Sequence, residues 1–336
     1  MTRMTKTLAG RKAPEGTLIA VEQLGRRGLG RDYGRAMRIG VSLASQHAVQ
    51  DVRLGARWMI ERAAAARDAG LWCLTVGDHH ANASPYYQNT PMLGRLLAEW
   101  GQRPAGCLFL TPLWNPVLMA EQIGTLAALA GEPFIVQTGL GHGPAERLAL
   151  GTDARHRGRN LDHTIAVVGA LLAGQRVDDE YFGLAGARIN PRPPGEVEWW
   201  LGASAPAGIE RAARLGACWY AGFEFEACRR GLDYFAERCA HYGTQAVRNP
   251  VRQDVFVAAT DAEAEAAVRP ALNAGYRGMS EDTLIFGSVG RVAERMVRFA
   301  EIGFTDVVVR QITVRQPLAL RSYELLADVQ AAIVSA

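Results

Sequence analysis

The sequence predicts an α/β fold, a single (β/α)8 TIM barrel with loop insertions. From Met37 onward, short apolar runs alternate with segments of helical composition, and eight such runs occur along the chain. Alternation of strands and helices implies parallel strands joined by right-handed crossovers. Eight units favour a closed barrel over an open sheet, and 336 residues is enough for a barrel of about 250 residues with insertions.

Each predicted strand is a short apolar run of ordinary strand length. The run MRIGVSL opens the barrel, and LWCLTV forms the second strand. The predicted strands are residues 37–43, 71–76, 105–111, 133–141, 197–204, 218–223, 252–260 and 305–311.

The predicted helices have recognisable compositions, starts and stops. Residues 57–70 are rich in Ala, the strongest helix former, and end at Gly70. Pro91 and Pro116 suit the first turn of a helix, where a missing N–H is tolerated. The predicted helices are 57–70, 90–101, 115–131, 160–172, 206–216, 226–243, 261–275, 288–303 and 322–334, with an inserted hairpin at 176–195.

The chain is expected to hold one packed domain. Residues 1–36 carry many Arg and Gly residues without a clear period, so they are predicted to form a loosely ordered N-terminal extension. The barrel is predicted to occupy residues 37–336. The Arg26-Arg27 pair is not followed by an apolar segment, so it does not indicate an export signal.

Composition argues against several classes of partner. A net charge of +3 is small for a chain of 336 residues, so it does not indicate a positively charged surface for nucleic acid or for a membrane. No run approaches the roughly 20 apolar residues that a membrane span needs. Five scattered cysteines without a CxxC pair indicate a reducing, cytoplasmic location rather than a disulfide framework.

The second predicted strand ends in an unusual polar group. The stretch LWCLTVGDHH runs from apolar residues into Asp78, His79 and His80. The carboxyl ends of barrel strands carry the chemistry in this fold, which favours an acid–base or cofactor-orienting role for Asp78 and His79. A solvated turn is the simplest alternative. A metal site is another, but further ligands at suitable spacing are missing. The DHH phosphoesterases share the tripeptide, yet their other aspartate motifs are not visible.

Two glycine-containing strand ends indicate where a ligand would approach. In GASAP, a short turn leads into a helix whose amino terminus carries about half a positive charge, which suits a phosphate. Ser204 adds a hydroxyl, although a simple N-cap role explains it equally well. The stretch TGLGHG, from Thr138 to Gly143, lacks the GxGxxG pattern, so it is either a plain loop or a surface for a flat ring.

Together these segments resemble the bacterial luciferase-like family of flavin- and deazaflavin-dependent oxidoreductases. The resemblance extends from about Met37 to Ile333, and its order and spacing are more specific than any single segment. The segments that carry it are LWCLTVGDHH, TPLWNPVLMAEQIGTLAALAG, FIVQTGLGHGPAERLALG, RGRNLDHTIAVVGALLAGQRV, YFGLAGARINPRPP, WWLGASAPAGIERAARLGA and FGSVGRVAERMVRFAEIGF.

The resemblance implies a cofactor, reduced FMN or coenzyme F420, and a set of residues around it. It places Asp78 and His79 at the ring and the phosphate at the GASAP turn. It also implies a non-prolyl cis peptide between residues 107 and 109, under the ring. The implied cofactor-binding residues are Cys107, Leu108, Phe109, Thr138, Gly139, Gly141, Gly202, Ala203, Ser204, Gly222 and Phe223.

The expected function is therefore flavin-dependent oxidation or hydride transfer on a small organic substrate, in a monooxygenase or related oxidoreductase. The family's luciferases place an Arg in the fourth-strand loop, where this chain has TGLG, so light emission is not implied. The resemblance also implies a homodimer. A non-catalytic flavin-binding barrel and a metal-dependent hydrolase are the alternatives. The loops at 82–89 and 276–285 carry no motif that names the substrate.

Overall fold

A computed structural model of the chain describes residues 37–47, 49, 51–81, 85–141, 143–152, 155–312 and 315–335. The extension predicted at residues 1–36 lies outside the described residues. The central sheet contains only parallel strand pairs, and its spatial order is β10-β9-β11-β1-β2-β3-β4-β7-β8. Its strands are β1 (Arg38–Leu43), β2 (Leu74–Val76), β3 (Pro104–Phe109), β4 (Gly131–Thr138), β7 (Val197–Gly202), β8 (Cys218–Tyr220), β9 (Pro250–Ala258), β10 (Ile285–Ser288) and β11 (Asp306–Gln311).

A short contact brings the two ends of the eight-strand run together. Ala221, just after β8, forms a parallel bridge with Val251 of β9. The Ala221 N–H donates to the Pro250 carbonyl at 3.1 Å, and the Arg252 N–H donates to the Ala221 carbonyl at 2.9 Å. The eight predicted strands therefore follow one another around a barrel, as the sequence indicates.

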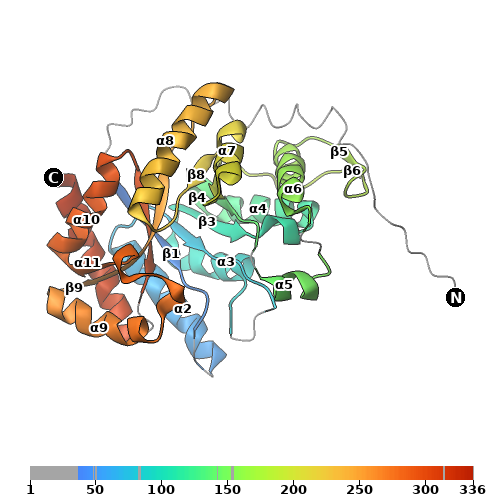
Figure 1. Cartoon of the computed structure of the whole chain (residues 1–336). Helices are drawn as coiled ribbons and strands as arrows, with labels where there is room; N and C mark the ends of the chain where they lie inside the picture. Colours follow the sequence, from blue (N-terminus) through green and yellow to red (C-terminus); the bar gives the residue numbers. More distant parts are fainter. Residues whose placement is uncertain are drawn as a thin grey trace.

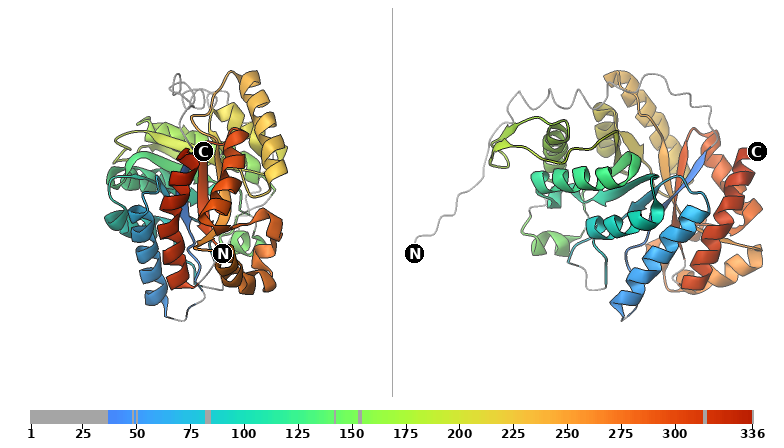
Figure 2. Two further views of the ribbon diagram at one scale, coloured as in Figure 1. Left: turned by 90° about the vertical axis from the view of Figure 1, so that its left-hand side faces the viewer. Right: turned by 180° about the vertical axis from the view of Figure 1, so that it is seen from behind.

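Helices cover the outside of the sheet (Figures 1 and 2). They form because each βα crossover buries one apolar helix face against the strands. The helices are α2 (Val52–Asp68), α3 (Asn89–Trp100), α4 (Pro116–Leu129), α5 (Pro144–Ala149), α6 (Arg157–Leu172), α7 (Pro206–Leu215), α8 (Phe225–Tyr242), α9 (Asp261–Asn273), α10 (Val289–Glu301) and α11 (Gln316–Ser335). Short 3-10 turns occur at η2 (Thr111–Leu113), η3 (Tyr276–Gly278) and η4 (Glu281–Thr283).

The inserted hairpin is confirmed, and four details of the prediction are wrong, one being the start of α11, which lies six residues before the predicted one. Strands β5 (Val177–Asp179) and β6 (Leu184–Ala187) form the antiparallel hairpin beside α6 (Figure 1). The structure adds a ninth sheet strand, β10, which is too short to show a period in sequence. It adds the one-and-a-half-turn helix α5 in a predicted loop. Helix α2 begins five residues earlier than expected because Asp51 caps it by accepting a hydrogen bond from the Arg53 N–H.

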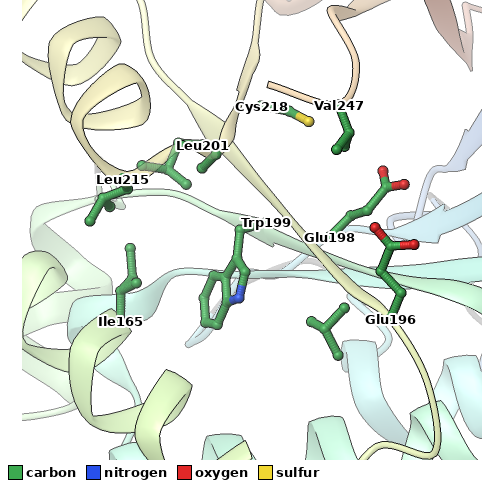
Figure 3. Close-up of a pocket in the computed structure, with 11 residues that line it drawn as sticks. Ile165, Glu196, Glu198, Trp199, Leu201, Leu215, Cys218 and Val247 are labelled. Carbon is green, nitrogen blue, oxygen red and sulfur yellow. The ribbon is translucent and has the colours of Figure 1, made fainter. Parts of the chain in front are cut away.

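A small pocket lies outside the barrel, between β7 and the helices α6 and α7 (Figure 3). Trp199, Leu201 and Ile165 line its apolar part, with Glu196 and Glu198 at its acidic edge. None of the predicted site residues lines it, so it does not contribute to the candidate site.

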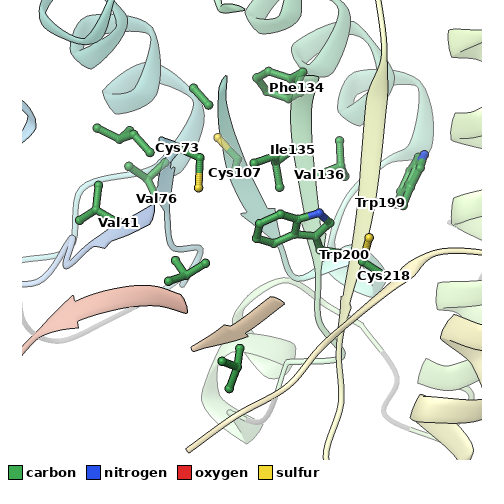
Figure 4. Packing of buried hydrophobic residues seen from close by; sticks show 14 of the residues in the cluster. Val41, Cys73, Val76, Cys107, Phe134, Ile135, Val136, Trp199, Trp200 and Cys218 are labelled. Carbon is green, nitrogen blue, oxygen red and sulfur yellow. The ribbon is translucent and has the colours of Figure 1, made fainter. Parts of the chain in front are cut away.

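Apolar residues of neighbouring strands form the core (Figure 4). Trp200, Ile135 and Val136 are fully buried there, and Cys107 and Cys218 pack in the same cluster. All five cysteines are free and buried, and burial raises the pKa of Cys73, Cys107 and Cys218. Within the described residues, no helix is long and apolar enough to cross a membrane.

The amino-terminal end of the barrel is closed by matched charges. Arg38 pairs with the buried Asp306 at 2.6 Å, and Arg248 pairs with the buried Glu198 at 3.0 Å. Both guanidinium groups lie over the ring of Trp72, at 3.7 and 4.8 Å from its centroid. Arg38 and Arg248 thus each have their own carboxylate.

Candidate active site

The carboxylate of Asp78 is the most buried polar group at the end of β2. It is 0% exposed, and its Oδ2 accepts hydrogen bonds from the Leu110 N–H and the Trp114 Nε1–H, both at 2.8 Å. Leu110 and Trp114 flank η2, directly after β3, so one carboxylate ties the ends of two neighbouring strands together. The other oxygen, Oδ1, lies 3.1 Å from Nε2 of His80.

The two adjacent histidines take different partners. His80 faces Asp78, and this interaction raises the pKa of its imidazole above the ordinary value, with burial opposing it. His79 points away, with about half of its side chain exposed, and its Nδ1 lies 2.8 Å from Oε1 of Glu146. The edge of the His79 ring also meets Tyr86, with centroids 5.3 Å apart. The expected link between Asp78 and an imidazole is therefore made through His80, the second histidine.

Glu146, on the short helix α5, is a site residue that the sequence did not reveal. Its Oε1 contacts His79 and also accepts a hydrogen bond from the His80 N–H at 2.9 Å. Burial raises the pKa of its carboxyl, but the hydrogen bonds from His80 and His79 and the charges on both rings outweigh burial, so the net pKa is lowered. Because α5 was expected to be a loop, no periodicity marked Glu146 as inward-facing.

The end of β3 lies beside this cluster. Cys107 and Phe109 are fully buried, so a ligand could reach only their backbone, whereas Leu108 is partly exposed. The cis peptide bonds of the described residues precede Pro133 and Pro191, so the expected non-prolyl cis bond between 107 and 109 is wrong. The physical reason is that β3 remains a regular extended strand here, paired with β4 in unbroken parallel register from Ala105 to Phe109.

The end of β4 supplies small groups next to β3. Thr138 is buried, and its Oγ1 has no hydrogen-bond partner among the described residues. The Gly139 carbonyl accepts the Thr111 N–H at 3.1 Å, which ties this turn to η2. Gly141 has a φ of +67°, a conformation that favours glycine. His142, which belongs to the same glycine-rich stretch, lies outside the described residues.

The turn after β7 has the features of an anion site. The N-cap of α7 is Ala205, with no side-chain cap and no acidic residue in the first turn, so the alternative that Ser204 is only an N-cap is wrong. Gly202 and Ser204 are exposed, while the Ala203 carbonyl is held by the Trp219 Nε1–H at 2.8 Å. Pro206 has no N–H, and the Gly208 and Ile209 N–H groups donate to the Ala205 carbonyl, which leaves the Ala207 N–H and the exposed Ser204 hydroxyl as the donors of this helix start that fit a cofactor phosphate.

The end of β8 completes the rim. A side chain added at Gly222 would meet nothing within 4 Å, so there is open space above it. Phe223 is half-buried beside this space. Open space and small residues at these strand ends fit a flat cofactor ring. Among the described residues, no group of three or more His, Cys, Asp or Glu side chains is placed to hold a metal ion.

Comparison with known proteins identifies the family. A family model described as luciferase-like monooxygenase matches residues 37–279. This match covers well over half of the 336 residues, so the chain belongs to that family.

One curated relative is the F420-dependent glucose-6-phosphate dehydrogenase of Mycobacterium avium (strain 104). It is 30% identical over 174 residues, which is 48% of this chain and 51% of the relative. The chain spans about half the length, or less, of the curated relatives it matches.

Solved structures share the fold at lower identity. The monooxygenase RslO1 from Streptomyces bottropensis has a TM-score of 0.76 at 16% identity, over 87% of this chain and 98% of its own. An F420-dependent secondary alcohol dehydrogenase in complex with an F420-acetone adduct has a TM-score of 0.74 at 16% identity, over 89% and 99%. The FMN-bound oxygenating constituent of 3,6-diketocamphane monooxygenase from Pseudomonas putida has a TM-score of 0.70 at 17% identity, over 87% and 97%.

Replacing the buried carboxylate tests its hold on His80. In Asp78→Asn, the amide oxygen can still accept from Leu110 and Trp114, while the amide N–H₂ faces His80 and favours its neutral form. The pKa of His80, measured by NMR titration, should therefore fall.

The same variant should change stability in a pH-dependent way. A raised folded-state pKa stabilises the protein below the ordinary value of 6.5, and this is lost as pH rises through the raised value. Asp78→Asn should thus cost about 1–3 kcal/mol in acid and less in alkali. Asp233→Asn, whose side chain is 75% exposed, is the matched control. A loss independent of pH would contradict the pairing.

Proposed function

We propose that this protein is a flavin- or deazaflavin-dependent oxidoreductase, a luciferase-like monooxygenase or hydride-transfer enzyme acting on a small organic molecule. The observation that carries the proposal is that an acid–imidazole cluster and an uncapped helix amino terminus open on the same rim of the barrel. A phosphate-bearing cofactor with a flat ring would place its phosphate at the helix start and its ring beside the cluster. The names of the relatives, which mention F420, FMN and monooxygenase activity, support it.

Reduced FMN or coenzyme F420 would supply the reducing equivalents when bound. The Gly202–Ser204 turn would hold the phosphate through its N–H groups and the Ser204 hydroxyl. Partly exposed Leu108, buried Thr138 and the glycines at 139 and 141 would line the ring, with Gly222 and Phe223 close by. Cys107 and Phe109 would contribute only backbone.

Within this proposal His79 is the proton-handling group. It is the half-exposed imidazole of the pair, and the carboxylate of Glu146 orients its Nδ1. A general acid or base needs access to the reacting group and a pKa near the operating pH. Asp78 is then a positioning residue, because it holds His80 and the η2 segment rather than facing the open rim.

Phosphate recognition is tested with FMN and riboflavin, which differ by the phosphate alone. A hydrogen bond to a charged group is worth about 1.5–3 kcal/mol, so Ser204→Ala should weaken FMN binding about tenfold to a hundredfold. Riboflavin binding should be unchanged. Fluorescence titration measures both, Ser335→Ala on the distant α11 is the control, and coenzyme F420 is titrated in parallel. Equal losses for both flavins would refute the phosphate assignment.

The role of His79 is tested by turnover and stability on the same variant. His79→Ala should lower the rate of cofactor oxidation by about 10²–10⁴-fold, because general acid–base groups contribute on that scale. Its thermal midpoint should change little, since the ring is half exposed. His80→Ala should instead lower the midpoint, through loss of the Asp78 contact. Normal turnover with a lowered midpoint in His79→Ala would show that the motif at the end of β2 is only a structural turn.

We also infer that two copies of the chain associate as a homodimer. The family resemblance is one support, and the exposed leucines of the α5 region are another, since Leu148 is 83% exposed and Leu150 is 44% exposed. Light scattering at micromolar concentration should give twice the 36.4 kDa chain mass, and a monomer there would contradict the proposal. The free, buried cysteines support a reducing, cytoplasmic location.

A further inference from the structure

A second cluster of charges lies on the later strands of the barrel. Arg252 and Asp254 are two residues apart on β9, so their side chains leave the same face of the sheet. Arg310 of β11 is paired in register with Asp254. Tyr276 and Arg277 arrive from η3, in the connection between β9 and β10, and both contact Asp254.

The cluster is unbalanced in charge. The fully buried Asp254 accepts hydrogen bonds from the Tyr276 hydroxyl at 2.9 Å and from Nη1 of Arg277 at 2.7 Å, both through Oδ2. Nε of Arg252 lies 3.6 Å from Oδ1 of the same carboxylate. Among the described residues Arg310 forms no ion pair. Arg252 and Arg277 therefore share one carboxylate and Arg310 adds a third positive charge beside them, whereas Arg38 and Arg248 at the opposite end each have their own carboxylate.

Several donors in this cluster are buried without a hydrogen-bond acceptor. Nε and Nη2 of Arg252 and Nε of Arg310 have no hydrogen-bond partner among the described residues. Burial lowers the pKa of Arg252, and the like charges of Arg277 and Arg310 lower it further against the opposing effect of Asp254. Buried unpaired donors of this kind are costly unless a ligand accepts from them.

The backbone of η3 also has an unfavourable conformation at Arg277. Arg277 has a φ of +50°, in the left-handed region that a residue with a side chain seldom adopts. Its contact with Asp254 offsets that cost and keeps its guanidinium group beside Arg252. A segment outside the core thereby delivers a third cation to the cluster.

The position of the cluster relates it to the candidate active site. The Arg252 guanidinium carbon lies 4.2 Å from the centroid of the Phe223 ring, at the end of β8. On the other side, the charge of Arg310 acts on Tyr86, whose ring contacts His79. Arg252 thus lies at the β8 end of the rim, and Arg310 is near enough to Tyr86 for its charge to act on that side chain.

We propose that Arg252, Arg277 and Arg310 bind an anionic group, a carboxylate or a phosphate, of the organic substrate. This rests on the proposed function, because it assumes that the rim holds a cofactor and a substrate together. In the proposed function the cofactor's own phosphate would lie elsewhere, at the start of α7, which follows β7. A substrate anchored on the arginines would extend toward His79.

The test uses small anions as probes on the whole chain without cofactor. Inorganic phosphate and benzoate are titrated by calorimetry, with benzyl alcohol as the uncharged counterpart of benzoate. Both anions should bind and benzyl alcohol should not. Arg252→Met and Arg310→Met should each weaken anion binding about tenfold to a hundredfold, the effect of one lost charge-assisted hydrogen bond. Arg321→Met, whose side chain is 64% exposed on α11, should leave binding unchanged.

FMN and riboflavin titrations on the same variants distinguish the two sources of an anion. An unchanged preference for FMN supports the substrate assignment. Loss of that preference in Arg252→Met or Arg310→Met would overturn it, because the arginines would then hold the cofactor phosphate. Absence of anion binding, or equal binding in all variants, would also overturn it. If the β9 and β11 variants do not fold, Arg277→Met, at a side chain about one-third exposed, provides the same measurements.

The proposal and the proposed function fail in different ways. If neither flavin nor coenzyme F420 binds while the anions do, the proposed function is wrong and the anion site remains, without its assignment to a substrate of that enzyme. If the cofactor binds and the anions do not, only the arginine site is wrong.

Discussion

The buried carboxylate of Asp78 is the interaction on which the candidate site depends. One oxygen binds the Leu110 and Trp114 N–H groups, and the other faces His80. It therefore fixes the end of β2, the turn after β3 and one imidazole at once. A charged acceptor in a dry environment makes strong hydrogen bonds, and its loss would leave buried donors unpaired. Glu146 extends the same network outward to His79.

Parallel topology explains why these groups meet. In a barrel of parallel strands every carboxyl end opens on the same rim, so residues from distant parts of the chain converge there without any sequence proximity. The start of α7 follows β7 and the open space at Gly222 follows β8. The acid–imidazole cluster combines residues that follow β2 with Glu146, which follows β4. Their convergence supports a bound cofactor more strongly than any of these features alone.

The two ends of the barrel differ in how they treat charge. At the amino-terminal end, Arg38 and Arg248 each have a buried carboxylate and lie over Trp72, which makes that end a closed, balanced layer. At the other end Arg252 and Arg277 share Asp254, and Arg310 beside them forms no ion pair among the described residues. The paired charges at the amino-terminal end stabilise the fold. The buried donors of Arg252 and Arg310, which have no acceptor among the described residues, are available to a ligand. The difference in charge pairing between the two ends supports ligand binding at the carboxyl-terminal rim and a structural role for the amino-terminal end.

Sequence alone determined the barrel, its strand order and the polar end of β2, because apolar runs alternating with helices are a local pattern and parallel crossovers allow few topologies. The sequence also located the GASAP turn, because small residues directly before a predicted helix are a local pattern. Only the tertiary structure decided that Asp78 faces His80 rather than His79, that Glu146 joins them, and that the β3 peptides are trans. It also brought Arg252, Arg277 and Arg310 together. Side-chain direction at a strand end and contacts between distant residues, such as His79 and Glu146, which are 67 positions apart, depend on packing, which leaves no periodic signal in the sequence.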